Sequence, residues 1–392
     1  MSTQDPVALI VAAFALALVF ATHGKASDAL SPWAEGVQIR PVSTQEGRHT
    51  IHSYFNVCPE SPDGRWVLFY ASGAADGHEG EVRILERATG KEEALARNVS
   101  VEDAHRAACQ QWASSGRRVV LHDARNGQWV VAAVDVATRQ ERVLARDRQL
   151  CWGQPQSDLV TLYGCHWNPG AHTGLELLNV ETGEIKVVVT ASAVKEAYPA
   201  WVAKQFGDAP LSVFFPILSP DLKRVFFKMA TPLGGDFRSS KASRREGLVC
   251  YDLANRRFLF LREKWGHPCW HPNSRTILEP GNLLIDSDTG ALSRVPDQPA
   301  FRGSHPSISP DGQLFVTDAL LAYEQGKQEW AVVVGLMSGG RHQVIHRFDN
   351  SRGARSWRRS HPHPVFSPDG KRIYYNVSSG QWTQLCVAEA KP

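Results

Sequence analysis

The chain has 392 residues, of which 43% are hydrophobic and 21% are charged, a composition that excludes a disordered or fibrous protein. Lys and Arg number 43 against 40 Asp and Glu. This balance, and basic patches without interleaved aromatics, argue against nucleic acid as a partner. Twelve Trp, 31 Gly and 23 Pro beside three Met favour many short strands and turns over helices.

The N-terminus begins with an apolar run. Residues 7–21 are apolar throughout, and this run is shorter than the about 20 residues that a membrane-spanning helix needs. Its length is typical of the apolar centre of a signal peptide, although the residues before it include Asp5 and contain no Lys or Arg. We therefore expect residues 1–29 to be a signal peptide or an N-terminal membrane anchor. The protein is accordingly predicted to be exported to the periplasm or cell envelope, with membrane contact only through this segment if it is uncleaved.

A repeated motif follows the leader, in which an S-P-D-G turn precedes a strand of alternating apolar residues. Clear copies of the motif open at Ser61, Ser219, Ser309 and Ser367. A degenerate copy opens at His271, and two weaker copies open at Gln111 and Gln154. The mean period is about 50 residues, which is typical of propeller blades. In each turn Pro presets φ, Asp caps the turn through its side chain, and Gly takes the positive φ.

Seven such units predict an all-β fold, a seven-bladed β-propeller of four-stranded antiparallel blades, as one domain over residues 37–392. Residues 37–42 are expected to supply the last strand of blade 7 and so close the ring. A helical period is suggested only at residues 194–205. The seven cysteines form no C-x-x-C motif, so we expect most of them to be small buried hydrophobes, with at least one free thiol.

Histidines interrupt the repeat at one matched position, four residues before the turn. His267, His305 and His363 occupy it in blades 5, 6 and 7, and His361 shares a strand face with His363. Imidazoles from converging strands suit Zn, Mn, Fe, Ni or Cu, and a histidine outside the metal shell suits a general base. A water-lined channel without a metal is the alternative. His52 and His105 lie just upstream of the inner strands of blades 1 and 2 and are expected near the same mouth.

Two clusters of cationic side chains flank the histidine blades. The first cluster lies in a loop of blade 4 and comprises Arg238, Lys241, Arg244 and Arg245. The second lies just before the blade 7 histidines and comprises Arg352, Arg355, Arg358 and Arg359. Guanidinium groups pair well with carboxylates, so these clusters favour an acidic substrate, with solvated loops as the alternative. No G-x-S-x-G elbow, P-loop or dinucleotide fingerprint is present.

Three segments that carry these histidines resemble the oligogalacturonate lyase family of seven-bladed propellers, and the wider repeat resembles TolB-type propellers. They are GHPCWHPN, SHPSISPDGQLFVTD and SHPHPVFSPDGKRIYYN, which begin at residues 266, 304 and 360. The resemblance implies Mn²⁺, or another divalent transition metal, held by His305, His361 and His363. It also implies His267 as the base, with Arg244 or Arg245 as its partner in catalysis. Arg358 stands where the family has a metal-binding glutamine.

Two functions follow as hypotheses. The first is a metal-dependent lyase that acts by β-elimination on acidic, uronate-containing oligosaccharides. In it His52, His105, Arg238 and Arg358 are the candidate substrate-binding residues. The second is a non-catalytic, TolB-like envelope propeller that binds a protein or ligand. Fold alone does not decide between them. The sequence does not specify the oligomeric state.

Overall fold

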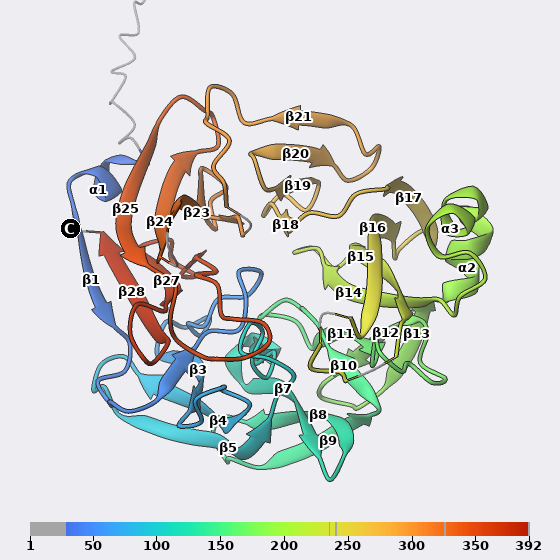
Figure 1. Cartoon of the computed structure of the whole chain (residues 1–392), viewed down its shortest axis with the longest axis horizontal. Coiled ribbons are helices and arrows are strands. Elements are labelled where there is room, and N and C mark those ends of the chain that lie inside the picture. Colours follow the sequence, from blue (N-terminus) through green and yellow to red (C-terminus); the bar gives the residue numbers. More distant parts are fainter. Residues whose placement is uncertain (1–28, 235, 240, 304, 325–326, 391–392) are drawn as a thin grey trace, which may run out of the picture.

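Seven four-stranded antiparallel sheets stand in a ring in the computed structural model, which describes residues 29–390 except 235, 240, 304 and 325–326 (Figure 1). This arrangement confirms the predicted seven-bladed β-propeller. The predicted signal peptide or anchor lies outside the described residues, apart from Ala29. In the described part of the chain, no helix is long and apolar enough to cross a membrane.

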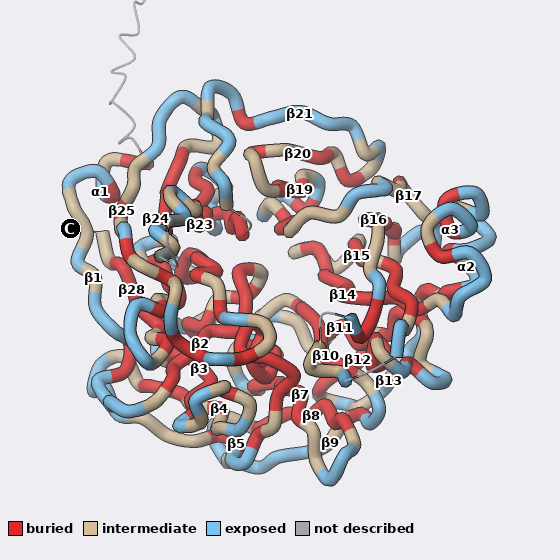
Figure 2. The backbone as a smooth tube through the Cα atoms, viewed as in Figure 1, coloured by how far each residue is buried: buried red, intermediate tan, exposed pale blue. Residues whose placement is uncertain are grey.

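Blades 1 to 6 each run from an inner strand to an outer strand in chain order, whereas the outermost strand of blade 7 comes from the N-terminal part of the chain. Blade 1 comprises β2 (His49–Ile51), β3 (Trp66–Ser72), β4 (Glu79–Glu86) and β5 (Glu92–Ser100), and blade 2 comprises β6 (Gln111–Ala113), β7 (Arg118–Arg125), β8 (Gln128–Asp135) and β9 (Glu141–Arg146). Blade 3 comprises β10 (Arg148–Leu150), β11 (Leu159–Gly164), β12 (Leu175–Asn179) and β13 (Ile185–Val189), and blade 4 comprises β14 (Ser212–Leu218), β15 (Arg224–Pro232), β16 (Ser243–Asp252) and β17 (Arg257–Arg262). Blades 5 to 7 comprise β18 (Cys269–Trp270), β19 (Thr276–Glu279), β20 (Leu283–Asp286) and β21 (Leu292–Arg294); β22 (Ser307–Ile308), β23 (Leu314–Glu324), β24 (Lys327–Leu336) and β25 (His342–Asp349); and β26 (Val365–Phe366), β27 (Arg372–Val377), β28 (Gln384–Ala390) and β1 (Val37–Pro41). The inner strands and the strands next to them are mostly buried (Figure 2).

The ring closes by pairing the two ends of the chain. Strand β1 (Val37–Pro41) lies antiparallel to β28 (Gln384–Ala390), with Val37 opposite Ala390 and Pro41 opposite Cys386. The outermost strand of blade 7 thus comes from the N-terminal part of the chain, as the sequence predicts. A short helix, α1 (Ser31–Ala34), precedes this strand, and its Trp33 packs against Phe366 of blade 7.

The S-P-D-G turns have the geometry that their residues dictate. In blade 6 the Ser309 hydroxyl donates to the Asp311 carboxylate and accepts from the backbone N–H of Leu314 at 2.9 Å. Gly312 follows with φ +74°, a conformation that only glycine adopts without strain. In blade 4 Leu222 replaces the glycine and is held at φ +61°. The turn therefore survives this substitution at the cost of local strain.

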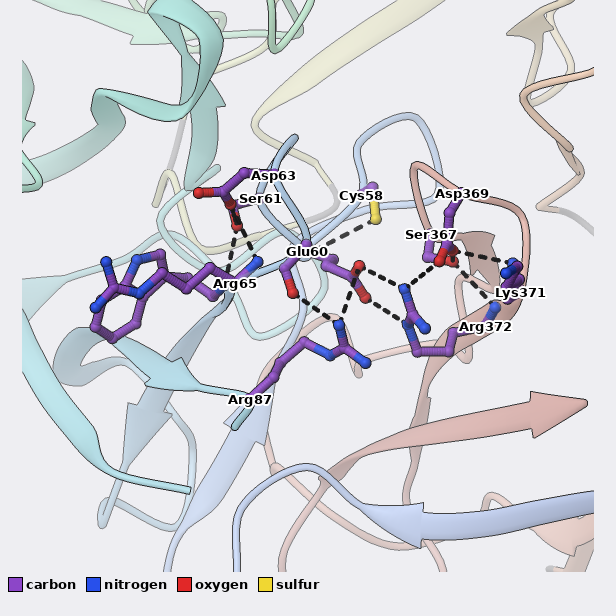
Figure 3. A network of polar contacts seen from close by, with 12 residues as sticks. Cys58, Glu60, Ser61, Asp63, Arg65, Arg87, Ser367, Asp369, Lys371 and Arg372 are labelled. Atoms are coloured by element: carbon purple, nitrogen blue, oxygen red, sulfur yellow. Dashed lines mark hydrogen bonds and ion pairs between the residues drawn. The ribbon is translucent and has the colours of Figure 1, made fainter. Parts of the chain in front are cut away.

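A buried ion pair joins blades 1 and 7 at the face where these turns lie (Figure 3). The buried Glu60 accepts from Nε and Nη2 of Arg372, each at 2.8 Å, and from the Tyr374 hydroxyl. Nη1 of Arg87 lies 3.7 Å from the same carboxylate. Because these partners belong to the first and the last blade, the contact reinforces the closure of the ring.

Replacing Glu60 by Gln is expected to lower the free energy of unfolding by about 3 kcal/mol, because Arg372 then loses its buried counter-charge. Glu86→Gln is the matched control. It removes a carboxylate that pairs with an arginine of 60% side-chain exposure and is expected to lower the midpoint much less than Glu60→Gln does. Urea-unfolding midpoints measure both effects. Equal midpoints for the two variants would show that the Glu60 contact does not reinforce the ring.

The predicted helical segment forms two helices on the outer rim between blades 3 and 4 (Figure 1). They are α2 (Ala191–Ala197) and α3 (Pro199–Phe206), and they are separate because Pro199 lacks the N–H that would continue α2. Trp201 of α3 is buried beside Gly247 of blade 4. The expectation for the cysteines is confirmed, since all seven are free thiols and all except the half-buried Cys58 are buried.

Candidate metal centre and substrate site

Four histidines from three blades meet where the chain enters the inner strands. His105 precedes β6, His305 precedes β22, and His361 and His363 precede β26. One ligand nitrogen from each lies within 4.8 Å of those of the other three. The structure thus brings together the three predicted metal ligands, and it adds His105, which the sequence placed among the substrate-binding candidates.

The second ring nitrogens of two of these histidines are fixed by hydrogen bonds. Nδ1 of His305 donates to Oδ2 of Asp318 at 2.6 Å, and Nδ1 of His105 donates to the carbonyl of Arg359 at 3.0 Å. Both contacts leave Nε2 free for the cluster. A carboxylate or carbonyl behind a histidine is the usual arrangement around a metal, because it fixes the tautomer and orients the ring.

Ring nitrogens in the cluster lack any hydrogen-bond partner although they are buried. They are Nε2 of His105, Nε2 of His305, Nδ1 of His361, and both ring nitrogens of His363. Buried polar atoms are almost always paired, and each unpaired one is costly. His363 also has φ +48°, a strained backbone conformation for a residue with a side chain. The donor set therefore fits a divalent transition metal.

Burial lowers the pKa values of three histidines of the cluster, His105, His361 and His363. Burial lowers the pKa of His361 to about 3 and that of His363 far below its ordinary value, and the neighbouring imidazoles lower both further. The pKa of His105 is also depressed, first by burial and then by Arg358. Neutral imidazoles carry the lone pair that a metal requires. The rings of Tyr54 and Phe55 cover one side of the cluster, with centroids 4.6 Å from His363 and 5.2 Å from His305.

His267 lies beside the four-histidine cluster without belonging to it. Its ring centroid is 4.7 Å from that of His305, and the residue is only partly exposed. Burial, and then His305, Lys228 and Arg358, hold its pKa well below the ordinary value. A neutral imidazole in this position can accept a proton from a molecule bound at the cluster.

Two cationic side chains, Lys228 and Arg358, act electrostatically on His267, and Arg245 acts in turn on Lys228. Lys228, Arg245 and Arg358 are half-buried, and within the described residues none of them forms an ion pair with a carboxylate. Burial, and then Arg245 and Arg358, depress the pKa of Lys228, and burial lowers the pKa of Arg245 to about 10. Partly buried cations without a counter-charge are costly, so this arrangement fits an anionic ligand.

A buried network positions Arg245. Its guanidinium packs over Phe214, 4.4 Å from the ring centroid, and Nε donates to the Ser243 hydroxyl at 3.0 Å. Nη2 lies 3.2 Å from Nε2 of His166, and His166 in turn contacts the Glu102 carboxylate at 3.1 Å. The charges of neighbouring groups, Arg106 first, hold the pKa of Glu102 well below its usual range although burial opposes this.

Lys228 is the residue that sequence reasoning missed. It is the only charged residue between Val225 and Ala230 of β15, and its Nζ lies 3.7 Å from the centroid of the Trp265 ring. Burial lowers its pKa well below the ordinary value. A lone charge in an otherwise apolar strand was the available signal, because a strand facing only the core has no use for an ammonium group.

Arg244 and Arg238 bind elsewhere in the protein, and His52 contacts the backbone of the cluster rather than contributing a ligand nitrogen to it. Arg244 alternates with Arg245 along β16, is exposed, and donates to Oε1 of Gln205 at 2.9 Å. Arg238 donates to the backbone carbonyl of Val101 at 3.1 Å, which ties the blade 4 loop to the end of blade 1. His52 lies behind His363, since its Nε2 donates to the His363 carbonyl at 2.9 Å.

Buried histidines also make the stability of the fold depend on pH. Burial lowers the pKa values of His52, His122 and His166 to about 4, 3 and 4. Below pH 6.5 these histidines bind protons in the unfolded chain but stay unprotonated in the folded chain. The free energy of unfolding therefore falls as the pH drops towards 4. Each histidine contributes a loss on the order of 3 kcal/mol over this range. Urea unfolding of metal-stripped protein between pH 7 and 4.5 checks this expectation. A free energy of unfolding that does not change over this pH range would contradict it.

The fold and the cluster together define a seven-bladed propeller with a four-histidine site that is suited to a metal. No protein-family model matches the sequence, and no curated protein matches it. Solved structures do match. An oligogalacturonate lyase in complex with manganese is 18% identical, with 91% of this chain and 93% of that chain covered at a TM-score of 0.61.

Two further solved structures show the same likeness. An oligogalacturonate lyase from Vibrio parahaemolyticus is 16% identical, with 91% of this chain and 94% of that chain covered, also at a TM-score of 0.61. The hydrazine synthase of Kuenenia stuttgartiensis is 14% identical, with coverage of 86% and 95% and a TM-score of 0.50. At these identities the likeness shows the fold alone.

Proposed function

We propose that this protein is a metal-dependent lyase that cleaves acidic, uronate-containing oligosaccharides by β-elimination. One observation carries the proposal: buried imidazole nitrogens without hydrogen-bond partners converge, with His267 beside them and the cations Lys228 and Arg358 close to His267. The likeness to oligogalacturonate lyases supports it at the level of the fold. Export through residues 1–29 remains a prediction.

The chemistry requires neutralisation of a carboxylate next to the proton that leaves. The C5 proton of a uronate is weakly acidic until the charge of the adjacent carboxylate is offset. Arg245, Arg358 and Lys228 supply positive charge and hydrogen-bond donors for that group and for the negative charge that develops in the transition state. His267 takes the C5 proton, the electron pair forms the C4–C5 double bond, and the C4–O bond breaks. The leaving sugar oxygen then acquires a proton.

The four-histidine cluster provides the metal site in this proposal. His105, His305, His361 and His363 would hold the ion, which the resemblance implies to be Mn²⁺. When bound, the metal supplies Lewis-acid stabilisation of the substrate carboxylate. We infer that His105 takes the fourth ligand position, because Arg358 stands where the family has a glutamine and a guanidinium cannot ligate a metal. Arg358 is thereby free to contact substrate.

The ultraviolet absorbance of unsaturated uronate tests the proposal. Oligogalacturonate, alginate and glycosaminoglycan fragments are incubated with the protein after treatment with a chelator, with and without added Mn²⁺. We expect Mn²⁺-dependent absorbance on at least one uronate substrate. The exposed His342→Ala variant, which removes an imidazole far from the cluster in sequence, controls for non-specific effects. Silence across the whole panel would contradict the lyase and favour the non-catalytic propeller.

A further inference from the structure

A second cationic site lies next to the four-histidine cluster, in the segment that joins β25 to β26. A hollow of about 650 Å³ is lined there by Arg352, Arg355 and Arg359, together with Ser351 and Gln381. No lining residue is acidic, and within the described ranges none of the three arginines forms an ion pair. All three are exposed. We call this hollow the arginine pocket.

Backbone hydrogen bonds hold the arginine pocket in place. The N–H of Arg352 donates to the carbonyl of Ser378 at 2.9 Å, and that of Gly353 donates to Gly380 at 3.0 Å, both in the hairpin of blade 7. The N–H of Arg355 donates to the carbonyl of Ala75, in the hairpin of blade 1, at 2.9 Å. The guanidinium groups therefore extend from a backbone that is fixed on two blades, which lowers the cost of ordering them around a ligand.

A single stretch of backbone separates the arginine pocket from the four-histidine cluster. The carbonyl of Arg359 accepts from Nδ1 of His105, while its guanidinium lines the pocket and donates to the Ser351 carbonyl. The preceding residue, Arg358, acts electrostatically on His105 and His267. Two adjacent residues, Arg358 and Arg359, thus contribute to the two sites.

A second hollow at another part of the surface provides a contrast. It holds about 550 Å³ and is also lined by three arginines, Arg65, Arg117 and Arg139. Each of these has a carboxylate partner; the partners are Glu86, Glu181 and Glu93. Its charge is therefore neutralised within the protein. The arginine pocket lacks such partners and is available to carboxylates from outside.

We propose that the arginine pocket is a second anion-binding subsite, which holds carboxylates of the same acidic oligosaccharide that reaches the four-histidine cluster. The inference rests on the proposed function and narrows its substrate to chains of several uronate units. A disaccharide occupies only the site at the cluster, whereas a longer chain also engages the guanidinium groups. The affinity for an acidic oligosaccharide therefore increases with its length.

Calorimetric titration with oligogalacturonates of two and eight sugars tests this inference in the His267→Ala background, in which turnover is expected to be slow. The R352Q/R355Q/R359Q variant is expected to weaken binding of the longer chain about tenfold and to leave the disaccharide unchanged. The R65Q/R117Q/R139Q variant removes the same charge from the other hollow and is expected to bind both chains like the parent.

Equal affinity for the two chain lengths would overturn the inference, as would an R352Q/R355Q/R359Q variant that binds the longer chain like the parent. An equal loss in the two triple variants would also overturn it, because the effect would then come from net charge. If the parent protein shows no lyase activity but binds longer chains more tightly through the arginine pocket, the subsite is supported and the proposed lyase function is contradicted. The two proposals therefore fail separately.

Discussion

Replacing His267 by alanine is expected to lower kcat on a uronate substrate by about 10²–10⁴-fold, the usual contribution of a positioned general base. His267 lies outside the group of four histidines whose ligand atoms converge, so the bound metal is expected to stay at the level of the parent protein. The KM is expected to change little, because Arg245, Arg358 and Lys228 still bind the carboxylate. Steady-state kinetics and metal content, measured on the same preparation, check both statements.

Two further variants make this expectation specific. His267→Gln, which keeps a polar side chain without a base, is expected to be as inactive as His267→Ala. His271→Ala is the control, since it removes a half-buried imidazole of the same blade that contacts the carbonyl of Gly312 in a turn. A His267→Ala variant that retains full activity would exclude the histidine as the base. Lys228 would then be the next residue to replace.

Replacing His361 and His363 together by alanine is expected to remove the metal and, with it, all measurable lyase activity. These residues contribute two of the four converging ligand nitrogens, and the two that remain do not make up a transition-metal site. Replacing a residue that hydrogen-bonds to a metal ligand typically lowers metal affinity 10–100-fold. The loss of metal affinity in the double variant is expected to be larger than that. Elemental analysis and the absorbance assay measure the two effects.

Asp318→Asn is the informative companion to this double variant. It leaves every ligand in place but weakens the hydrogen bond that orients His305. We expect a 10–100-fold lower metal affinity with activity recovered at high metal concentration. If the double variant kept its metal while folded, as judged by an unchanged urea midpoint, the four-histidine cluster would not be the metal site.

The repeated turn made the fold and part of the site predictable. A histidine four residues before the turn has the same place in every blade, so His267, His305 and His363 were expected to gather, and the structure brings them together. The convergence of His361 with His363 was predicted for a reason that was wrong, since both residues precede β26 instead of sharing a strand face, and His363 has φ +48°. The matched histidine positions depend only on local spacing within a blade.

The remaining parts of the site depend on contacts that the repeat does not encode. His105 reaches the cluster through the irregular segment between β5 and β6, where no S-P-D-G turn fixes its position. The choice between Arg244 and Arg245 depends on the register of β16 with β15, which alternates their side chains between two faces. Packing between blades, rather than any sequence pattern, places Lys228 under Trp265.

Elemental analysis of the unmodified, purified protein tests the central claim most directly. The unpaired imidazole nitrogens of the four-histidine cluster are expected to hold about one transition-metal ion per chain, either as purified or after Mn²⁺ is supplied and excess is removed. A folded protein that binds no transition metal under either condition would contradict the account. The non-catalytic propeller would then be the function to pursue.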